Sequence, residues 1–497
     1  MDGALHFLQG SGCTFSMLPR ENVHQILGHL DVKALISAAQ ACTTFRDFAR
    51  NKEQWRARFF ALEKQMFQST MDTNIWDELG TNFATLTRDQ QGQVKETSLN
   101  KLVAAITPQA ELPDMMDVST FLVTYQTFTT TAHLIRKLMQ RYMVPEPKNS
   151  SPDELKNYTT SVVRPIQVRV AKIFKQVLES QWKDIDDSLL DLIKAFVLGI
   201  VDQTILAKQC QAGVQSVISK KRSERRSDDQ QASSSSAAAA AGVSALAKKL
   251  TLMGSLYDLS SEEIARQLTL IEFETYSQIK PTEFFGQAWA KPKHHHRAPS
   301  IRSMIDRFNA ITRWITTEIV SEEKIRNRVK RYMKFIKIAQ ALRQMHNYHT
   351  LMAILGGLNE GPVYRLKFTK AELPPKFQQA IAELQNVMSA DGSYNAYRLE
   401  LAAATPPCIP YIGVYLRDLT YFDEGGGGSD GMINFKSKKN VYSVIQIIQK
   451  YQTTLYPFKV NERAYNHLKS IKGLDDAELH KTSLLREPKN AKRQDIV

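Results

Sequence analysis

Apolar side chains recur every three or four residues along residues 412–424, a spacing that places them on one face of a helix. They are Ile412, Tyr415, Leu419 and Phe422. Small and polar residues repeat with the same spacing on the opposite face: Gly413, Arg417, Thr420 and Glu424. Prolines at 406, 407 and 410 keep the preceding residues out of a helix, and glycines at 425–428 end it. The pattern predicts a short amphipathic helix with Thr420 and Glu424 away from the core.

The same periodicity predicts helices along most of the chain. Residues 93–218 read as helical throughout, with two long apolar stripes. These are Ile166, Val170, Ile173 and Val177, then Leu189, Leu192, Ile193, Phe196 and Ile200. Residues 255–488 open on a helix capped by Ser260 or Ser261, and a later helix passes Met352 and stops after Asn359, before Gly361 and Pro362. We expect an all-α protein with three modules, and at most a small hairpin or strand near Tyr364.

A chain of 497 residues exceeds what one hydrophobic core organises. We divide it into a small unit at 15–60, a connector at 61–92, an accessory helical domain at 93–218, a linker at 219–254, a large helical domain at 255–488 and a tail at 489–497. The linker assignment rests on a basic cluster at 220–226 followed by serine and alanine runs.

The small unit at 15–60 has the spacing of three short helices, with Trp55 expected in their core. Its apolar positions also resemble an F-box, which is too small to be stable without a partner. In that family the partner is the Skp adaptor of cullin ubiquitin ligases. The resemblance implies that the adaptor binds at Leu18, Pro19, Ile26, Leu27 and Leu30.

Residues 406–420 read Pro-Pro-Cys-Ile-Pro-Tyr-Ile-Gly-Val-Tyr-Leu-Arg-Asp-Leu-Thr, followed by Glu424 and Gly425. This closely resembles the signature of Ras-family guanine-nucleotide exchange factors of the Son-of-Sevenless type. Further phrases resemble the same family, in the same order: residues 120–130, 264–272, 362–366 and 433–439. The resemblance covers roughly residues 95–215 and 255–488. Several separated phrases in order are more specific than a single motif.

The resemblance implies that the helix at 412–424 is half of a hairpin that opens the nucleotide site of a small GTPase. It assigns the catalytic positions to Glu424, Thr420, Asn359 and Tyr411 and the GTPase contacts to Asn359, Met352 and Arg417. Thr420 would lie near the magnesium site, and Glu424 would bond the phosphate-loop hydroxyl that holds magnesium. The best-known relative has Leu at the Thr420 position, so the steric contribution is expected to be weaker. The accessory domain would brace the hairpin.

The formal net charge of +14 favours an acidic partner: nucleic acid, an anionic membrane surface or an acidic protein. A nucleic-acid binder is disfavoured because no helix-turn-helix, zinc or aromatic-basic motif appears. No run of 18 apolar residues and no secretion signal is present, and the four cysteines are scattered. We expect a cytoplasmic protein in a reducing compartment, recruited in some states to the inner membrane surface.

No phosphate-binding loop, nucleophile elbow or HExxH motif occurs. The adjacent histidines 294–296 cannot easily converge on one ion, so we expect neither a metal nor another cofactor. The sequence therefore predicts an exchange factor without covalent chemistry. The alternative is an F-box substrate receptor that captures a GTPase for ubiquitination. The presence of Asn359 and Glu424 favours exchange, whereas the identity of the GTPase stays open.

Overall fold

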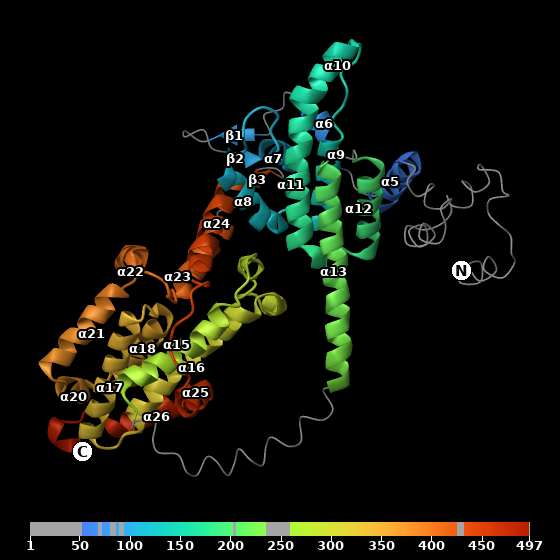
Figure 1. The fold of residues 1–497 in the computed structure, drawn as a ribbon. Helices are drawn as coiled ribbons and strands as arrows, with labels where there is room; N and C mark the ends of the chain where they lie inside the picture. Colours follow the sequence, from blue (N-terminus) through green and yellow to red (C-terminus); the bar gives the residue numbers. More distant parts are fainter. Residues whose placement is uncertain are drawn as a thin grey trace. The chain divides into compact units, whose positions relative to one another are not determined.

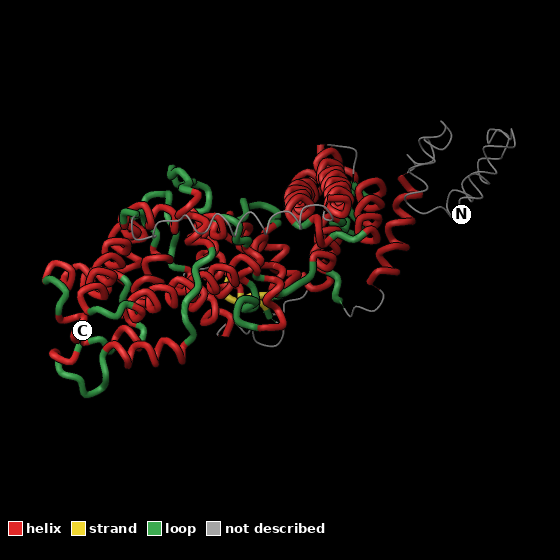
Figure 2. Tube along the Cα trace, turned by 90° about the horizontal axis from the view of Figure 1, so that it is seen from below, coloured by secondary structure: helices red, strands yellow, loops and turns green. Residues whose placement is uncertain are grey.

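The computed structural model describes residues 52–67, 72–79, 86–88, 94–201, 205–234, 259–424 and 432–496. Residues 15–51, which contain most of the F-box prediction and all five adaptor positions, lie outside them. The chain divides into two compact units, Met1–Gly242 with Gly428–Lys436, and Val243–Gly427 with Ser437–Val497. Helices dominate both units (Figure 2), so the predicted all-α, multi-domain fold class is confirmed. No helix in the described part of the chain is long and apolar enough to cross a membrane.

The first unit is a bundle of helices with one small sheet (Figure 1). Its helices are α5 (Lys52–Phe67), α6 (Ile75–Leu79), α7 (Leu99–Ile106), α8 (Met115–Thr124), α9 (Thr131–Tyr142), α10 (Pro152–Tyr158), α11 (Arg164–Ser180), α12 (Asp187–Gly199) and α13 (Ile205–Ser234). The sheet has the antiparallel order β1 (Leu86–Arg88), β2 (Val94–Thr97) and β3 (Ile433–Asn434).

The strand β2 corrects the expectation that residues 93–218 are helical throughout. Val94 and Thr97 are buried, and β2 pairs with β1 on one side and β3 on the other. The partner β3 comes from more than three hundred residues later in the chain. Pairing between such distant segments overrides local preference, and no pattern within residues 93–97 could reveal it.

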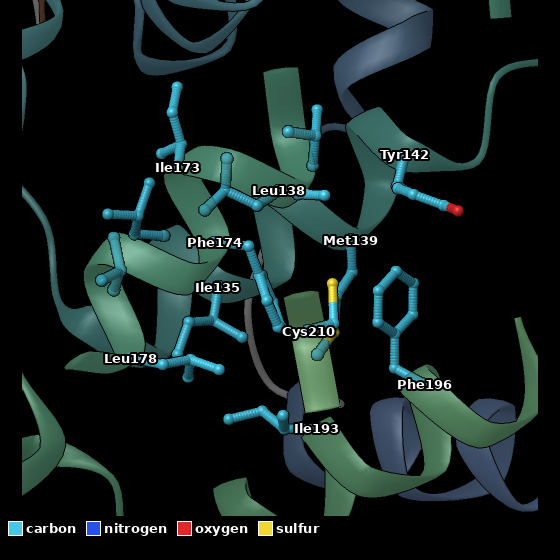
Figure 3. Packing of buried hydrophobic residues seen from close by; sticks show 14 of the residues in the cluster. Ile135, Leu138, Met139, Tyr142, Ile173, Phe174, Leu178, Ile193, Phe196 and Cys210 are labelled. Atoms are coloured by element: carbon cyan, nitrogen blue, oxygen red, sulfur yellow. The ribbon is translucent and has the colours of Figure 1, made fainter. Parts of the chain in front are cut away.

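The core of the first unit lies among α9, α11, α12 and α13, where Leu138, Phe174, Phe196 and Cys210 meet (Figure 3). The predicted stripes face this core, because all their members except the half-buried Ile200 are buried. Helix α5 joins the same cluster through Trp55 and Phe59, and the Phe59 ring lies 5.4 Å from the Phe196 ring. Trp55, which we expected in the core of the small N-terminal unit, therefore packs into this unit's core.

Helix α13 continues through residues 219–234, which the sequence pattern assigned to a linker. Lysine, arginine, glutamine and alanine are good helix formers, so a polar composition alone does not end a helix. Two ion pairs hold this stretch to its neighbours: Lys183 lies 2.8 Å from Glu224, and Lys221 lies 3.3 Å from Asp187. Residues 235–254, the rest of the expected linker, lie outside the described residues.

The described residues of the second unit form helices joined by loops, with one isolated backbone bridge between Asn347 and Ile409. Its helices are α15 (Ser261–Tyr276), α16 (Pro299–Ser321), α17 (Ile325–Gln344), α18 (Tyr348–Asn359), α19 (Gly361–Tyr364), α20 (Lys367–Ala371), α21 (Pro375–Val387), α22 (Asp391–Ala403), α23 (Ile412–Glu424), most of α24 (Phe435–Lys450), α25 (Glu462–Lys469) and α26 (Asp476–Arg486). Ser260 caps α15 as expected, since its hydroxyl accepts a hydrogen bond from the Glu263 amide. The expectation of a hairpin or strand near Tyr364 is wrong, because residues 361–364 form helix α19. Pro362 lies in its first turn.

Candidate functional site

Helix α23 starts beside the start of α18. A short backbone bridge joins Asn347, just before α18, to Ile409, just before α23. The Tyr348 amide donates to the Ile409 carbonyl at 2.9 Å, and the Ile409 amide donates to the His346 carbonyl at 2.9 Å. The Tyr411 amide then donates to the Tyr397 hydroxyl at 2.8 Å. These bonds occupy the backbone of the proline-rich segment, which cannot be helical itself, and fix the point from which α23 departs.

The two faces of α23 match the sequence prediction. Ile412, Tyr415 and Leu419 are buried, together with Val414 and Leu416, and Phe422 is half-buried. On the other side, Arg417 and Glu424 are exposed and Thr420 is half-buried. The Thr420 hydroxyl donates to the Leu416 carbonyl within the helix at 2.9 Å. The helix therefore presents a polar face from a rigid apolar base.

The last turn of α23 is held against the first turn of α24, which makes the two helices a hairpin. The Ser437 hydroxyl donates to the Phe422 carbonyl at 3.0 Å. Burial raises the pKa of the Asp423 carboxyl, while Lys438 of α24 and Lys291 act in the opposite direction. Glu424 follows Asp423 directly and ends the helix. The exposed carboxylate of Glu424 thus projects from a backbone that two helices position.

Four aromatic side chains cluster at the base of α23, with Tyr411 at their centre. Its ring centroid lies 5.9 Å from that of Phe308 on α16, 6.1 Å from that of His349 on α18 and 6.1 Å from that of Tyr394 on α22. The Arg417 guanidinium covers the Tyr394 ring at 5.1 Å, a favourable cation–π arrangement. Burial raises the pKa of Tyr411 to about 12, so the phenol stays neutral.

Gly413 is required for this arrangement of the Tyr411 ring. A Cβ atom at position 413 would lie 2.5 Å from the Tyr411 hydroxyl oxygen, well inside van der Waals contact. The backbone of Tyr394, on the opposite side of the cluster, has a φ of 63°, which is uncommon for a residue with a side chain. Both features show that the position of the aromatic rings is closely determined by the backbone.

The structure gathers some of the predicted site residues and separates others. Tyr411 and Arg417 meet at the aromatic cluster, and the half-buried Met352 lies one helical turn beyond His349 on α18. Asn359 is exposed at the far end of α18, about 17 Å along the helix from its start. Its amide oxygen accepts a hydrogen bond from Gln385 on α21 at 3.0 Å, so Asn359 is oriented from α21 and not from α23.

Sequence reasoning missed Phe308, His349 and Tyr394 as members of the site. They come from three different helices, and each fits an ordinary helical pattern in its own segment. The three-residue spacing of Tyr394 and Tyr397 gave no reliable sign either, because the φ of 63° at Tyr394 is not helical and the two residues do not share a helix face. Their convergence on Tyr411 is a product of tertiary packing.

His349 gives the site a pH-dependent stability. Burial lowers its pKa to about 4, below the value of about 6.5 expected in an unfolded chain. Between these values the unfolded chain binds a proton that the folded chain does not, so stability falls as pH drops through this window. We expect a loss of about 2 kcal/mol between pH 7 and pH 5 from this residue.

Urea unfolding at the two pH values, for the natural chain and for His349→Gln, isolates that contribution. The variant should lose less stability than the natural chain over this interval. An identical loss in both proteins would show that His349 titrates normally.

Comparison with known proteins places these features in a family. The RasGEF domain matches residues 263–439, the RasGEF N-terminal motif matches residues 93–196 and an F-box-like domain matches residues 15–61. The chain is 40% identical to Ras guanine nucleotide exchange factor G over 438 residues, 38% to factor J over 416 residues and 34% to factor A over 491 residues, all from Dictyostelium discoideum.

These matches cover 81%, 82% and 90% of the present chain, but 28%, 49% and 78% of the respective relatives. The chain therefore spans about half or less of the first two relatives and most of the third. The chain belongs to the family of Ras guanine nucleotide exchange factors.

Proposed function

We propose that this protein accelerates the release of GDP from a Ras-family small GTPase, so that GTP can load. The observation that carries the proposal is the face of α23: Arg417, Thr420 and Glu424 point away from the core on a helix whose base and tip are both fixed. The family membership supplies the class of partner. The activity is read directly from the loss of a fluorescent GDP analogue from the GTPase.

To release GDP, the protein must weaken the binding of the nucleotide to the GTPase, which needs no covalent step or cofactor. A picomolar complex with nucleotide corresponds to about 16 kcal/mol of binding free energy. A protein speeds release when it binds the nucleotide-free GTPase more tightly than the loaded one, because this differential affinity shifts the population. A helix that is already fixed suits this role, because little of the binding free energy is lost to ordering the helix. More of it is then available to deform the GTPase.

Within this proposal each site residue has a separate role. Glu424 takes the phosphate-loop hydroxyl that otherwise holds magnesium, and its negative charge repels the phosphates. Thr420, one turn earlier, lies against the magnesium site. Tyr411, Met352 and Arg417 form a contact surface around the aromatic cluster, and Asn359 contributes a hydrogen bond from the end of α18.

We also propose how the chain divides into modules. We assign an F-box to residues 15–60, a connector to 61–92, the accessory domain to 93–218, a linker to 219–254, the exchange domain to 255–488 and a tail to 489–497. The packing of α5 on α12 supports a connector that belongs to the accessory unit. The helix through residue 234 favours a later start of the linker. We further propose that the protein acts in the cytoplasm and at the inner membrane surface.

A second function is favoured by the F-box-like match at residues 15–61. We propose that this segment binds a Skp-type adaptor and links the protein to a cullin ubiquitin ligase. In the alternative to exchange, the same complex would capture a GTPase for ubiquitination without opening it.

Replacing Leu18 and Pro19 with Ala should abolish capture of purified Skp-type adaptor by the full chain, while GDP release stays at the unmodified rate. The reason is that both positions lie far in sequence from α23 and on the face expected to meet the adaptor. Pull-down and exchange are measured on the same preparation. Undiminished capture would show that adaptor binding does not use these residues.

A further inference from the structure

A cavity of about 910 Å³ lies in the second unit where the end of α15 approaches the start of α16. Two segments line it: residues 275–283, which run from the end of α15 into the short helix Pro281–Phe284, and residues 296–303. None of its lining residues belongs to α23 or α24. The wall is rich in hydroxyl groups, which come from Thr275, Ser277, Thr282, Ser300 and Ser303.

Cationic side chains outnumber carboxylates among the residues that line this cavity. Lys280, His296 and Arg297 line it and are exposed. Other cations of the unit are paired, such as Arg307 with Glu272 at 2.8 Å and Arg343 with Glu400 at 2.7 Å. In the described residues, neither Lys280 nor Arg297 forms an ion pair with a carboxylate, so both remain available to an anion.

The single lining carboxylate, Glu283, is already occupied by backbone amides. It is buried, and it accepts hydrogen bonds from the Ser300 and Ile301 amides at 2.8 and 3.1 Å and from the Lys280 amide at 3.3 Å. Glu283 therefore satisfies the first turn of α16. In the described residues it forms no ion pair with Lys280 or Arg297, so two cationic side chains line the cavity against one buried carboxylate. An incoming anion would be attracted by these side chains, and not by the helix terminus.

The walls of the cavity are held in place before any ligand arrives. The Gln452 amide nitrogen donates to the Tyr276 and Ile279 carbonyls, both at 2.9 Å, which fixes the turn that carries Lys280. Glu283 ties the same turn to α16. Binding at such a site loses little free energy to ordering the protein.

Further basic residues lie next to the lining residues His296 and Arg297 in the sequence. The segment Lys291–Arg297 precedes α16 and contains two lysines, three histidines and an arginine. Lys293 and Arg297 are exposed. Cations spaced along a wide, hydroxyl-lined cavity fit a ligand with several separated anionic groups better than a single phosphate, which could reach only one or two of them.

We propose that this cavity binds a multiply phosphorylated anion of the inositol-phosphate type, either as the headgroup of a membrane lipid or free in solution. Lys280 and Arg297 contact phosphate oxygens, and the hydroxyls donate to the remaining ones. Bound to a lipid, the site would hold the second unit at an anionic membrane surface. The inference does not depend on the exchange activity, because it concerns other residues and another ligand.

The test measures binding of the full chain to inositol hexakisphosphate in solution and to vesicles of phosphatidylcholine with or without phosphatidylinositol bisphosphate. Lys280→Ala/Arg297→Ala should weaken binding about tenfold or more, since each cation near an anionic surface contributes appreciably. The matched control is Arg326→Ala/Lys330→Ala, which removes the same charge from exposed positions on α17 outside the cavity. It should change binding less than about twofold, because Arg326 and Lys330 do not line the site.

Binding of both probes, or of either one alone, with loss only in the cavity variant supports the site. The probe that binds then identifies the source of the phosphates. Equal loss in both variant pairs would show diffuse attraction by net charge and overturn the proposal, as would absence of binding by the natural chain. The exchange rate with a soluble GTPase, measured in parallel, should be unchanged in both pairs.

Discussion

Glu424→Ala should slow GDP release from the cognate GTPase about tenfold or more, which corresponds to a loss of about 1.4 kcal/mol of barrier lowering. The carboxylate is exposed at the end of α23, so in the proposed function its interactions are made with the GTPase. The melting temperature of the variant should barely change, because exposed substitutions usually change stability by less than about 0.5 kcal/mol. Stopped-flow loss of a fluorescent nucleotide, with thermal unfolding of each variant, measures both quantities.

The matched control for Glu424 is Glu462→Ala, which removes an exposed carboxylate from α25 in the same unit. It should leave the release rate unchanged. If Glu424→Ala stays folded and exchanges at the unmodified rate, α23 does not act through this carboxylate. The proposal that the chain captures a GTPase without opening it would then become the better account.

Leu419→Ala should lower the free energy of unfolding by about 2–5 kcal/mol. Leu419 is 1% exposed on the inner face of α23, so truncation leaves a cavity under the helix that carries the proposed site. Urea unfolding followed by circular dichroism measures the change. Exchange should fall as well, because the projecting face depends on this base.

The control for Leu419 lies two residues away on the same helix. Tyr421 is a large side chain that is 74% exposed, so Tyr421→Ala should cost little stability. A similar loss from both substitutions would mean that α23 is not anchored by the side chains that the structure buries.

The helical parts of the site were readable from the sequence because their signals are local. The three-and-four spacing of Ile412, Tyr415 and Leu419 identified the buried face of α23, which left Arg417, Thr420 and Glu424 on the other side. The proline after Gly361 likewise marked the end of α18 at Asn359. Periodicity and capping act within a few residues, so one sequence contains enough information for them.

Features that depend on contacts between distant segments could not be predicted from local sequence patterns. The aromatic cluster brings Phe308, His349 and Tyr394 to Tyr411 from three other helices. The strand β2 needs β3 as a partner from the far end of the chain. Helix α13 continues into a polar stretch because its residues favour helix and because ion pairs connect it to Lys183, in the turn before α12, and to Asp187 of α12. In each case tertiary contacts decide what local composition leaves open.

The exchange activity itself is tested most directly by mixing the purified full chain with a panel of Ras, Rap and Ral GTPases loaded with fluorescent GDP, in the presence of excess unlabelled GTP. Nucleotide release from at least one of them should rise about tenfold or more above its intrinsic rate, in proportion to the concentration of the chain. Intrinsic release rates across the whole panel, from a chain that is folded and binds the GTPases, would contradict the proposed exchange activity.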